Sequence, residues 1–560
     1  MATYNPADLP TELLLKIFEH LEPQDILNVG ILCRRLALIS TPIYLARKGL
    51  PDPETFCRIS PSSKGHSDEV TALTLNYSLV SMKQFTCIFT GESESRRLSR
   101  ISDLTWNIRR VNKLLSRLAS IGIVTLAFYP KESHSLRSNY MRDFMPAFFE
   151  LLNTIFQKSC TSLQVLESHS LRLDEIYRFE FPETNTAAVW QGVRHFFAKY
   201  ISFKSSEDRF LQGSGWRYRE LSTGNPVPLS KPPILLQSRL THVDLCSNFL
   251  LLPPFAPYIF GLLKCSPISS LTLSLLRSTP AVEFRHFIFP RIIDTVPRLE
   301  EIKFAHFYRD SLSVVVRNLS AFPRLRRVTF GPRFPHDSTL LPIIWPSRRH
   351  LLTHLKSFTG SLDQAVYLFT QPISCPNLKA INITYHLTRS RDPPFHDEPD
   401  QKALLTKISS LGNRLSEMNL KPVITMCHLS EGSFSGPPFL EDEFESLKEL
   451  NGVTRLNIET PWFYHENDIL ASQISIALSF LRLFPRVKSF SLISHYLPPD
   501  PRKAEEHRSA ILAAILMEHP GIVSSDIIYN PLKHRHNHWR NALDNLDRTK
   551  PSEPCICSDF

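Results

Sequence analysis

Apolar residues recur at helical spacing near the start of the chain, at Leu13, Leu14, Ile17, Phe18 and Leu21. The spacing puts them on one face and predicts a short amphipathic helix. Pro10 suits its first position, where a missing N–H needs no partner. Pro23 predicts a turn, after which Asp25 is placed to cap a second helix. A third helix is predicted from near Ile31 to just before Pro42, because the residue ahead of a proline avoids helical angles.

Three helices of this length are too small to enclose a complete core, so the rest of the chain or a partner must cover part of their apolar surface. The segment resembles an F-box in the order and spacing of Leu9, Pro10, Glu12, Ile17, Phe18, Leu21, Asp25, Ile26, Leu27, Cys33, Arg34, Arg35 and Leu36. Leu36 stands where many members have Trp, and Gly30 weakens the junction of the second and third helices by about 1 kcal/mol relative to Ala. The alternative is a generic helical hairpin that caps a larger fold.

The F-box resemblance implies a domain over residues 1–50 that binds a Skp-type adaptor and, through it, a cullin. The residues that we expect to contact the adaptor are Leu9, Pro10, Leu13, Ile17, Leu21, Ile26, Leu27 and Cys33.

A second pattern fills the body of the chain: an apolar residue, two variable ones, an apolar, a variable and another apolar. It begins at Leu240, Ile268, Leu299, Leu325, Leu378, Leu415, Val453 and Val487, with weaker copies near Val70, Ile121, Leu163 and Leu352. Successive copies lie roughly 26 to 38 residues apart, with helical patterns between them, which is the period of leucine-rich repeats. Each copy predicts a short strand.

The fifth position of the pattern is consistently polar or small, at Asp244, Thr272, Lys303, Thr329, Asn382, Asn419, Asn457 and Ser491. This alternation predicts one buried and one solvated strand face. Parallel strands that are covered on both faces read as continuous apolar runs instead. The fold class predicted is therefore α/β: a three-helix F-box, then an irregular leucine-rich-repeat-like solenoid of short parallel strands and helices. An ordinary α/β domain remains the alternative.

The domain boundaries follow from composition. Residues 51–69 are Pro- and Ser-bearing and are interpreted as a linker, and residues 70–528 as the repeat domain. Polar, Pro-rich insertions are predicted at about 203–237, 388–401 and 428–439, and a polar tail at 529–560. Loops of this kind often join a binding surface.

Composition is that of a soluble globular protein, with 42% apolar and 21% charged residues. The net charge of +10 is dispersed, which argues against a nucleic-acid-binding patch. The ten cysteines suggest no disulfide framework, and no signal peptide precedes Asp8, so we expect an intracellular protein, cytoplasmic or nuclear. Prolines interrupt the uncharged run 245–263, so no membrane span is predicted.

No catalytic motif is present: there is no phosphate-binding loop, nucleophile elbow or zincin signature. The tail holds His534, His536, His538, Cys555 and Cys557, but their spacing is not that of a zinc site. We therefore predict no catalytic residues, no metal and no cofactor. A hydrolase with a site assembled from unrelated loops is the alternative without a supporting motif.

Together these features predict a non-catalytic substrate-recognition subunit of an SCF-type ubiquitin ligase, whose repeat arc binds an unknown target protein. The alternative is an F-box scaffold that degrades no target. The target is expected to contact the solvated strand face at His242, Asp244, Lys303, Arg327, Asn382, Asn419, Arg455 and Asn457. Arginine pairs well with carboxylate or phosphate, which favours an acidic or phosphorylated target segment.

Overall fold

The structure of the chain is a computed structural model. It describes residues 9–61, 68–90, 100–129, 138–167, 177–180, 217–220, 238–252, 255–274, 283–306, 309–331, 350–369, 373–388, 410–415, 417, 423–431, 453–460, 469–484, 486–494 and 501–529. The chain divides into two compact units, Met1–Leu299 and Glu300–Phe560.

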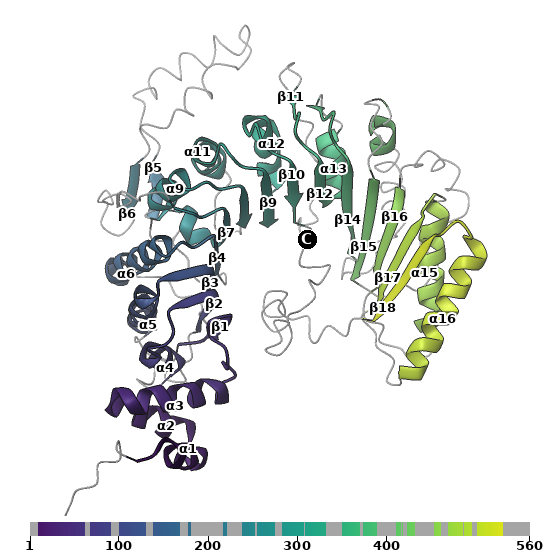
Figure 1. Ribbon diagram of the computed structural model, residues 1–560. Helices are drawn as coiled ribbons and strands as arrows, with labels where there is room; N and C mark the ends of the chain where they lie inside the picture. The colour runs from purple at the N-terminus through teal and green to yellow at the C-terminus, as the bar shows by residue number, and fades with distance from the viewer. Residues whose placement is uncertain are drawn as a thin grey trace, which may run out of the picture. The chain divides into compact units, whose positions relative to one another are not determined.

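Unit 1 begins with three helices and continues as alternating strands and helices (Figure 1). Its helices are α1 Thr11–His20, α2 Pro23–Leu32, α3 Arg34–Arg47, α4 Glu69–Leu75, α5 Arg100–Arg117, α6 Ser138–Gln157, η2 Asn248–Leu251, α9 Ala256–Lys264, η3 Phe284–Ile288 and α11 Phe289–Thr295. Its strands are β1 Phe56–Ile59, β2 Ser81–Thr90, β3 Ser120–Tyr129, β4 Ser162–Glu167, β5 Tyr177–Glu180, β6 Arg217–Glu220, β7 His242–Cys246 and β8 Ser270–Ser274.

Unit 2 repeats the alternation of strand and helix. Its helices are α12 Arg309–Asn318, η4 Leu319–Ala321, α13 Leu362–Phe369, α15 Ile469–Leu483 and α16 Pro501–Glu518. Its strands are β9 Glu301–His306, β10 Arg327–Phe330, β11 His350–Leu351, β12 Ser357–Ser361, β13 Ile373–Ser374, β14 Ala380–Thr388, β15 Val423–Glu431, β16 Val453–Thr460, β17 Ser489–Ser494 and β18 Ser524–Tyr529.

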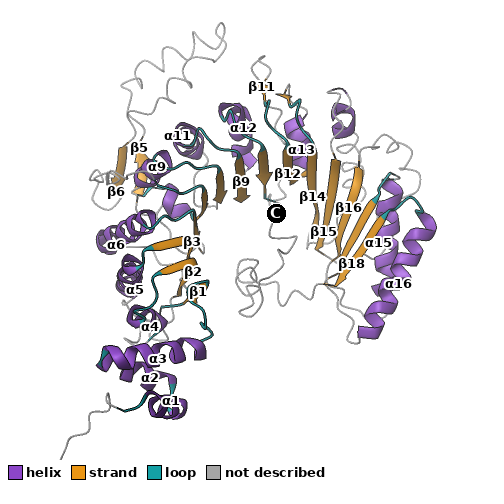
Figure 2. Cartoon of the chain, in the orientation of Figure 1, coloured by secondary structure: helices purple, strands orange, loops and turns teal. Residues whose placement is uncertain are grey.

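Parallel strands in chain order form the sheet of each unit. The order is β1-β2-β3-β4-β7-β8 in unit 1 and β9-β10-β12-β14-β15-β16-β17-β18 in unit 2. Among the described elements of each unit, the helices that follow the strands lie on one face of the sheet (Figures 1 and 2). The short pairs β5–β6, antiparallel, and β11–β13, parallel, stand apart from these sheets. The predicted mixed α/β class is confirmed.

Aromatic side chains bridge sheet and helices inside each unit. In unit 1, Phe128 of β3 stacks on Phe89 of β2 and meets Phe148 of α6 edge-on. In unit 2, Phe330 of β10 stacks on Phe304 of β9, with ring centroids 5.3 Å apart. All five rings are almost fully buried. Phe304 and Phe330 occupy apolar positions of predicted strands, so in β9 and β10 the buried face is the one that the alternation indicated.

Two predictions near the start of the body are wrong. The predicted linker 51–69 contains β1, because Cys57 and Ile59 alternate with less buried neighbours and pair beside β2. The weak strand pattern at Val70 is helix α4 instead. Asp68 caps that helix, with its carboxylate accepting a hydrogen bond from the Thr71 amide at 3.0 Å. Two apolar residues three positions apart are compatible with a strand or a helix. The Asp68 cap stabilises the helix.

The observed bounds of the N-terminal helices also differ from the predicted ones, again for local reasons. Helix α2 begins at Pro23 itself, so Asp25 lies in the first turn and caps nothing. Helix α3 starts at Arg34 and continues through Pro42 to Arg47. Proline disfavours a helical residue ahead of it but does not forbid one. Here the burial of Tyr44 and Leu45, which follow Pro42, stabilises the helix beyond the proline.

The strand predicted from Leu415 is also misplaced, because Leu415 belongs to a helical stretch and the strand is β15, from Val423. Strands β2 and β18 were missed. The insertions predicted at 203–237, 388–401 and 428–439 contain β6, the last residue of β14 and the end of β15. Their other residues, and the tail beyond Tyr529, lie outside the described residues.

Gly30 of α2 lies against Ser40 and Ala37 of α3. A Cβ atom there would lie 2.4 Å from Oγ of Ser40, and Ser40 is completely buried. Within the described residues the Ser40 hydroxyl has no hydrogen-bond partner. The glycine therefore permits a close approach of the two helices, in spite of its low helix propensity.

We expect Gly30→Ala alone to gain little, because relieving the clash costs on the order of 1 kcal/mol and offsets the higher helix propensity of alanine. Adding Ser40→Ala removes the clash and should make the double variant about 1 kcal/mol more stable than Gly30→Ala. Hydrogen exchange of the α2 and α3 amides measures this local stability. Equal protection in the single and double variants would contradict the packing argument.

Candidate functional site

Helix α1 is attached to α3 at both ends by arginines. Arg35 donates to the carbonyl of Leu9, just before α1, at 2.7 Å. Arg47 donates to the carbonyls of Leu21 at 2.6 Å, Phe18 at 2.9 Å and Glu19 at 3.0 Å. The last carbonyls of a helix lack partners within it, and a cation favours that end. Both arginines thus fix the position of α1 along α3.

The three helices bury only part of their apolar surface against each other. Leu14 and Phe18 of α1 and Ile26 and Leu27 of α2 form the interior, each at most 3% exposed. Six of the twelve large apolar residues that are exposed in the described part of the chain lie between positions 13 and 38. They are Leu13, Leu15, Ile17, Ile31, Leu32 and Leu38, from 41% to 74% exposed.

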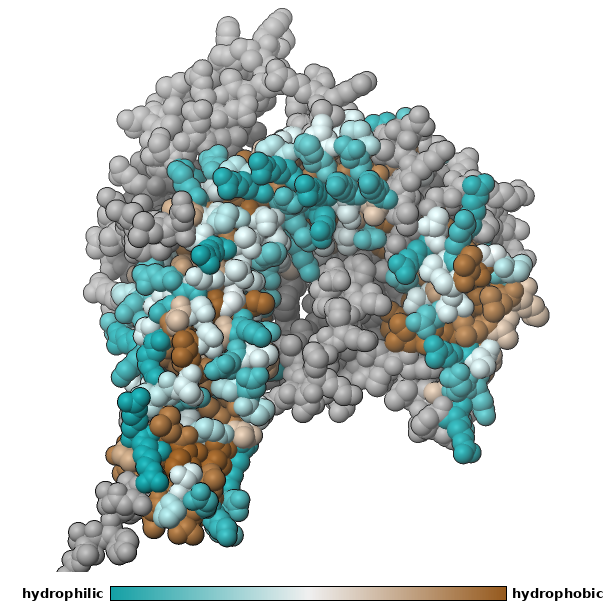
Figure 3. Space-filling model, viewed as in Figure 1, coloured by the Kyte–Doolittle hydropathy of each residue, from teal (hydrophilic) through white to brown (hydrophobic). Residues whose placement is uncertain are grey.

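These six residues are called here the apolar face of the N-terminal helices. Figure 3 shows apolar atoms gathered over α1, α2 and α3. Leu13 and Ile17 are four residues apart and so lie on one side of α1. Ile31 and Leu32 end α2, and Leu38 lies on α3. A concentration of exposed apolar side chains is typical of a surface that binds another protein.

The structure separates the predicted adaptor-binding residues into three groups by their exposure. Leu13, Ile17 and Pro10 are exposed, and Leu9, Leu21 and Cys33 are half-buried. Ile26 and Leu27 are fully buried, so they have no surface to offer and the prediction for them is wrong. These two residues match the F-box pattern because they form the interior of the three helices.

Sequence reasoning missed Leu15, Ile31, Leu32 and Leu38. The periodicity of α1 was assigned to a single apolar face, whereas Leu14 and Phe18 point inward and Leu13 and Ile17 remain outside. The sequence signal for exposure was the adjacent pair Ile31 and Leu32 at the end of α2. A helix cannot bury both members of such a pair against one neighbouring helix.

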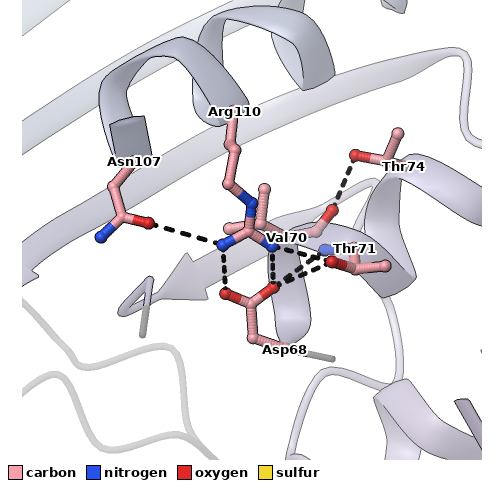
Figure 4. A network of polar contacts seen from close by, with 6 residues as sticks. All are labelled: Asp68, Val70, Thr71, Thr74, Asn107 and Arg110. Atoms are coloured by element: carbon pink, nitrogen blue, oxygen red, sulfur yellow. Dashed lines mark hydrogen bonds and ion pairs between the residues drawn. The ribbon is translucent and has the colours of Figure 1, made fainter. Parts of the chain in front are cut away.

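A buried polar network lies where the body begins and joins the start of α4 to α5 (Figure 4). The Arg110 guanidinium of α5 binds the Asp68 carboxylate through two bonds, at 2.7 and 2.5 Å, and donates to the Thr71 hydroxyl at 2.7 Å. Asp68 is 5% and Arg110 15% exposed. The guanidinium also lies 4.4 Å from the centre of the Trp106 ring. Such charge-assisted, two-point pairing fixes α4 against α5.

Helix α4 in turn contacts α3. Tyr44 of α3 is buried, and desolvation, with smaller contributions from the charges of Glu69 and Asp68, raises its pKa to about 12. Tyr77, just after α4, has the guanidinium carbons of Arg34 and Arg117 each 5.5 Å from its ring centre. Arg34 belongs to α3 and Arg117 to α5, so cation–π contacts connect the N-terminal helices to the body.

The solvated strand face of unit 2 aligns several of the predicted target-binding residues. Register places Lys303, Thr329, Thr359, Asn382, Thr425 and Arg455 in one row across β9, β10, β12, β14, β15 and β16. Asn382 donates to Thr359 at 3.2 Å. Exposed Arg327 lies on β10, where its guanidinium is 3.5 Å from the Glu301 carboxylate. Asn457 lies two residues beyond Arg455 on β16, and Asn419 lies outside the described residues.

In unit 1, His242 and Asp244 lie on the same face of β7. Asp244 accepts a hydrogen bond from Gln164 of β4 at 3.2 Å, and Gln164 accepts one from Thr125 of β3 at 3.2 Å. The row is a ladder of polar side chains across three neighbouring strands. It is suited to hydrogen bonding with a partner.

The described residues contain no cluster of three or more His, Cys, Asp or Glu side chains placed to hold a metal ion. The tail residues His534, His536, His538, Cys555 and Cys557 lie outside those residues. No helix in the described ranges has both the length and the apolar character needed to cross a membrane. The run 245–263 contains η2 and α9 instead.

Comparison with protein families matches residues 6–48 to the family described as F-box-like. The match covers α1, α2 and α3 and agrees with the resemblance seen in the sequence. No curated protein matches the chain. The N-terminal helices are therefore an F-box-like domain, and F-box domains typically bind Skp-type adaptors.

Asp68→Ala should destabilise unit 1 by about 3 kcal/mol, because it leaves the Arg110 charge buried without its partner. Protection of α4 and α5 amides from hydrogen exchange measures the loss. Asp52→Ala is the matched control. The Asp52 carboxylate also accepts a hydrogen bond from the backbone amide three residues later, that of Thr55, at 3.3 Å, but Asp52 is exposed. Equal loss of protection in the two variants would show that the buried network does not stabilise α4 and α5.

Proposed function

We propose that this chain is a substrate-recognition subunit of an SCF-type ubiquitin ligase. The F-box-like domain docks onto a Skp-type adaptor and through it a cullin, and the body captures a target protein. The observation that carries the proposal is the apolar face of the N-terminal helices, which coincides with the F-box-like match. The chain's own described residues leave this face exposed.

The body is, in this proposal, a leucine-rich-repeat-like solenoid. Its support is the parallel pairing of strands in chain order and the placement of helices on one face within each unit. A solvated face then remains for a target, as in other solenoids. The subunit carries no catalytic residue or cofactor and acts by proximity, raising the effective concentration of target lysines near the ubiquitin-charged enzyme. Its place of action is the cytoplasm or nucleus.

A scaffold that binds the adaptor without degrading a target uses the same apolar face. Co-purification separates the two functions: adaptor with cullin supports the ligase, and adaptor without cullin supports the scaffold.

Leu13→Asp with Ile17→Asp should weaken adaptor binding by about 2 kcal/mol or more, roughly 30-fold, because interface energy concentrates in a few apolar anchors. Titration calorimetry with a purified Skp-type adaptor measures the affinity of the full chain. Leu516→Asp with Met517→Asp is the matched control, since both side chains are exposed apolar residues of α16. Wild-type affinity in the first variant, or equal loss in both, would refute the assignment.

Arg327→Glu with Arg455→Glu should reduce target capture while adaptor binding is retained, because both side chains are exposed on the solvated strand face. Proximity labelling in cells with the ligase inhibited compares the captured proteins. The control, Arg109→Glu with Lys113→Glu, makes the same charge change on exposed positions of α5. Unchanged target ubiquitination in the first variant would place the target contacts on loops.

A further inference from the structure

The turns that precede β10, β12 and β14 share one backbone design. In each turn a leucine amide donates to the carbonyl three residues earlier: Leu325 to Phe322 at 3.2 Å, Leu355 to Leu352 at 3.3 Å and Leu378 to Cys375 at 3.2 Å. The buried leucine is followed in every case by an exposed basic residue, namely Arg326, Lys356 and Lys379. The repeated turn therefore presents a cation at the same place in three consecutive strands of the sheet.

Backbone hydrogen bonds align these cations. The Lys356 amide donates to the Arg326 carbonyl at 2.8 Å, and the Lys379 amide donates to the Lys356 carbonyl at 2.8 Å. Neighbouring strands lie about 4.8 Å apart, so the stems of the three side chains follow one another at that spacing. Arg324, at the tip of the first turn, is also exposed. Arg324, Arg326, Lys356 and Lys379 are called here the basic rim.

Among the described residues, an acidic neighbour neutralises the rim at its first strand. Arg326 pairs with the half-exposed Glu300 at 3.1 Å. Within the part of the chain that the structure describes, Lys356 and Lys379 form no ion pair. Like charges on adjacent strands repel each other. The turns are nevertheless held side by side, since the Asn377 amide group donates to the Thr353 carbonyl at 2.6 Å.

We propose that the basic rim binds an acidic peptide segment of a partner protein. An anionic chain crossing β10, β12 and β14 would relieve the repulsion within the row and pair with each cation in turn. The row extends over about 10 Å, which an extended peptide covers in about three residues. In the parts of these three turns that the structure describes, no exposed Phe, Tyr or Trp is present on which a base could stack, which favours a peptide over single-stranded nucleic acid. Hydrophilic residues gather in this region of unit 2 in Figure 3.

This binding surface differs from the apolar face of the N-terminal helices and does not depend on the proposed ligase role. It also differs from the target-binding residues on the strand face, because the rim residues lie at the turns before the strands. Mutations at the rim should therefore leave adaptor affinity unchanged.

Fluorescence anisotropy of labelled octaglutamate with the full-length protein tests the proposal. Lys356→Glu with Lys379→Glu should weaken binding about tenfold or more, since it replaces attraction by repulsion. Lys83→Glu with Lys113→Glu is the control, because both lysines are exposed in unit 1 and the net charge changes equally. The control should stay within about twofold of wild type, and wild-type binding should weaken as salt rises.

Lys356→Gln with Lys379→Gln should give an intermediate loss, which guards against a folding defect caused by the introduced acids. Failure of wild type to bind octaglutamate would overturn the proposal, and so would equal loss in rim and control variants. Tighter binding of an oligothymidylate of equal charge, lost in the same rim variant, would assign the rim to nucleic acid instead. Adaptor affinity, measured in parallel, reports separately on the proposed function.

Discussion

The register of the parallel strands is the constraint on which every surface of the body depends. Within unit 2, the amide just before each of β10, β12 and β14 donates to the carbonyl at the same position of the preceding turn, as Arg326 does to Glu300. Corresponding residues of successive strands are therefore neighbours in space although far apart in sequence. The buried phenylalanines, the polar row on the solvated face and the cations at the turns are three consequences of this alignment. A slip of one residue would exchange the buried and solvated sets.

The N-terminal helices obey a different constraint, because they are too few to cover their own apolar side chains. They adjoin the body of unit 1 through α3, which contacts α4, and α4 is tied to α5 through Asp68 and Arg110. The guanidinium groups of Arg34 of α3 and Arg117 of α5 both lie near the Tyr77 ring, so a cation–π contact also joins α3 to the body. The apolar surface that these contacts leave uncovered is available to a partner.

Periodic patterns carried most of what the sequence could reveal. Strands β7, β8, β9, β10, β14, β16 and β17 lie where alternating apolar residues predicted them. Prediction failed where two structures share a pattern and a tertiary contact decides: the Asp68 cap makes α4 a helix, and burial beyond Pro42 extends α3. At the candidate site, the pattern identified the domain but not its exposed side, since the buried Ile26 and Leu27 match the F-box pattern as well as the exposed Ile17 does. Which side chains face outward depends on helix packing, which no local pattern contains.

The double attachment of α1 has a consequence for the thermodynamics of association. Arg35 and Arg47 hold the helix at both ends before any partner arrives, so its backbone is ordered in the free protein. Docking through this surface then requires no coupled folding, and little conformational entropy is lost. The heat-capacity change on binding should reflect only the apolar area that is covered. In kinetic terms, such a pre-ordered surface allows an encounter to become a complex without waiting for a helix to form.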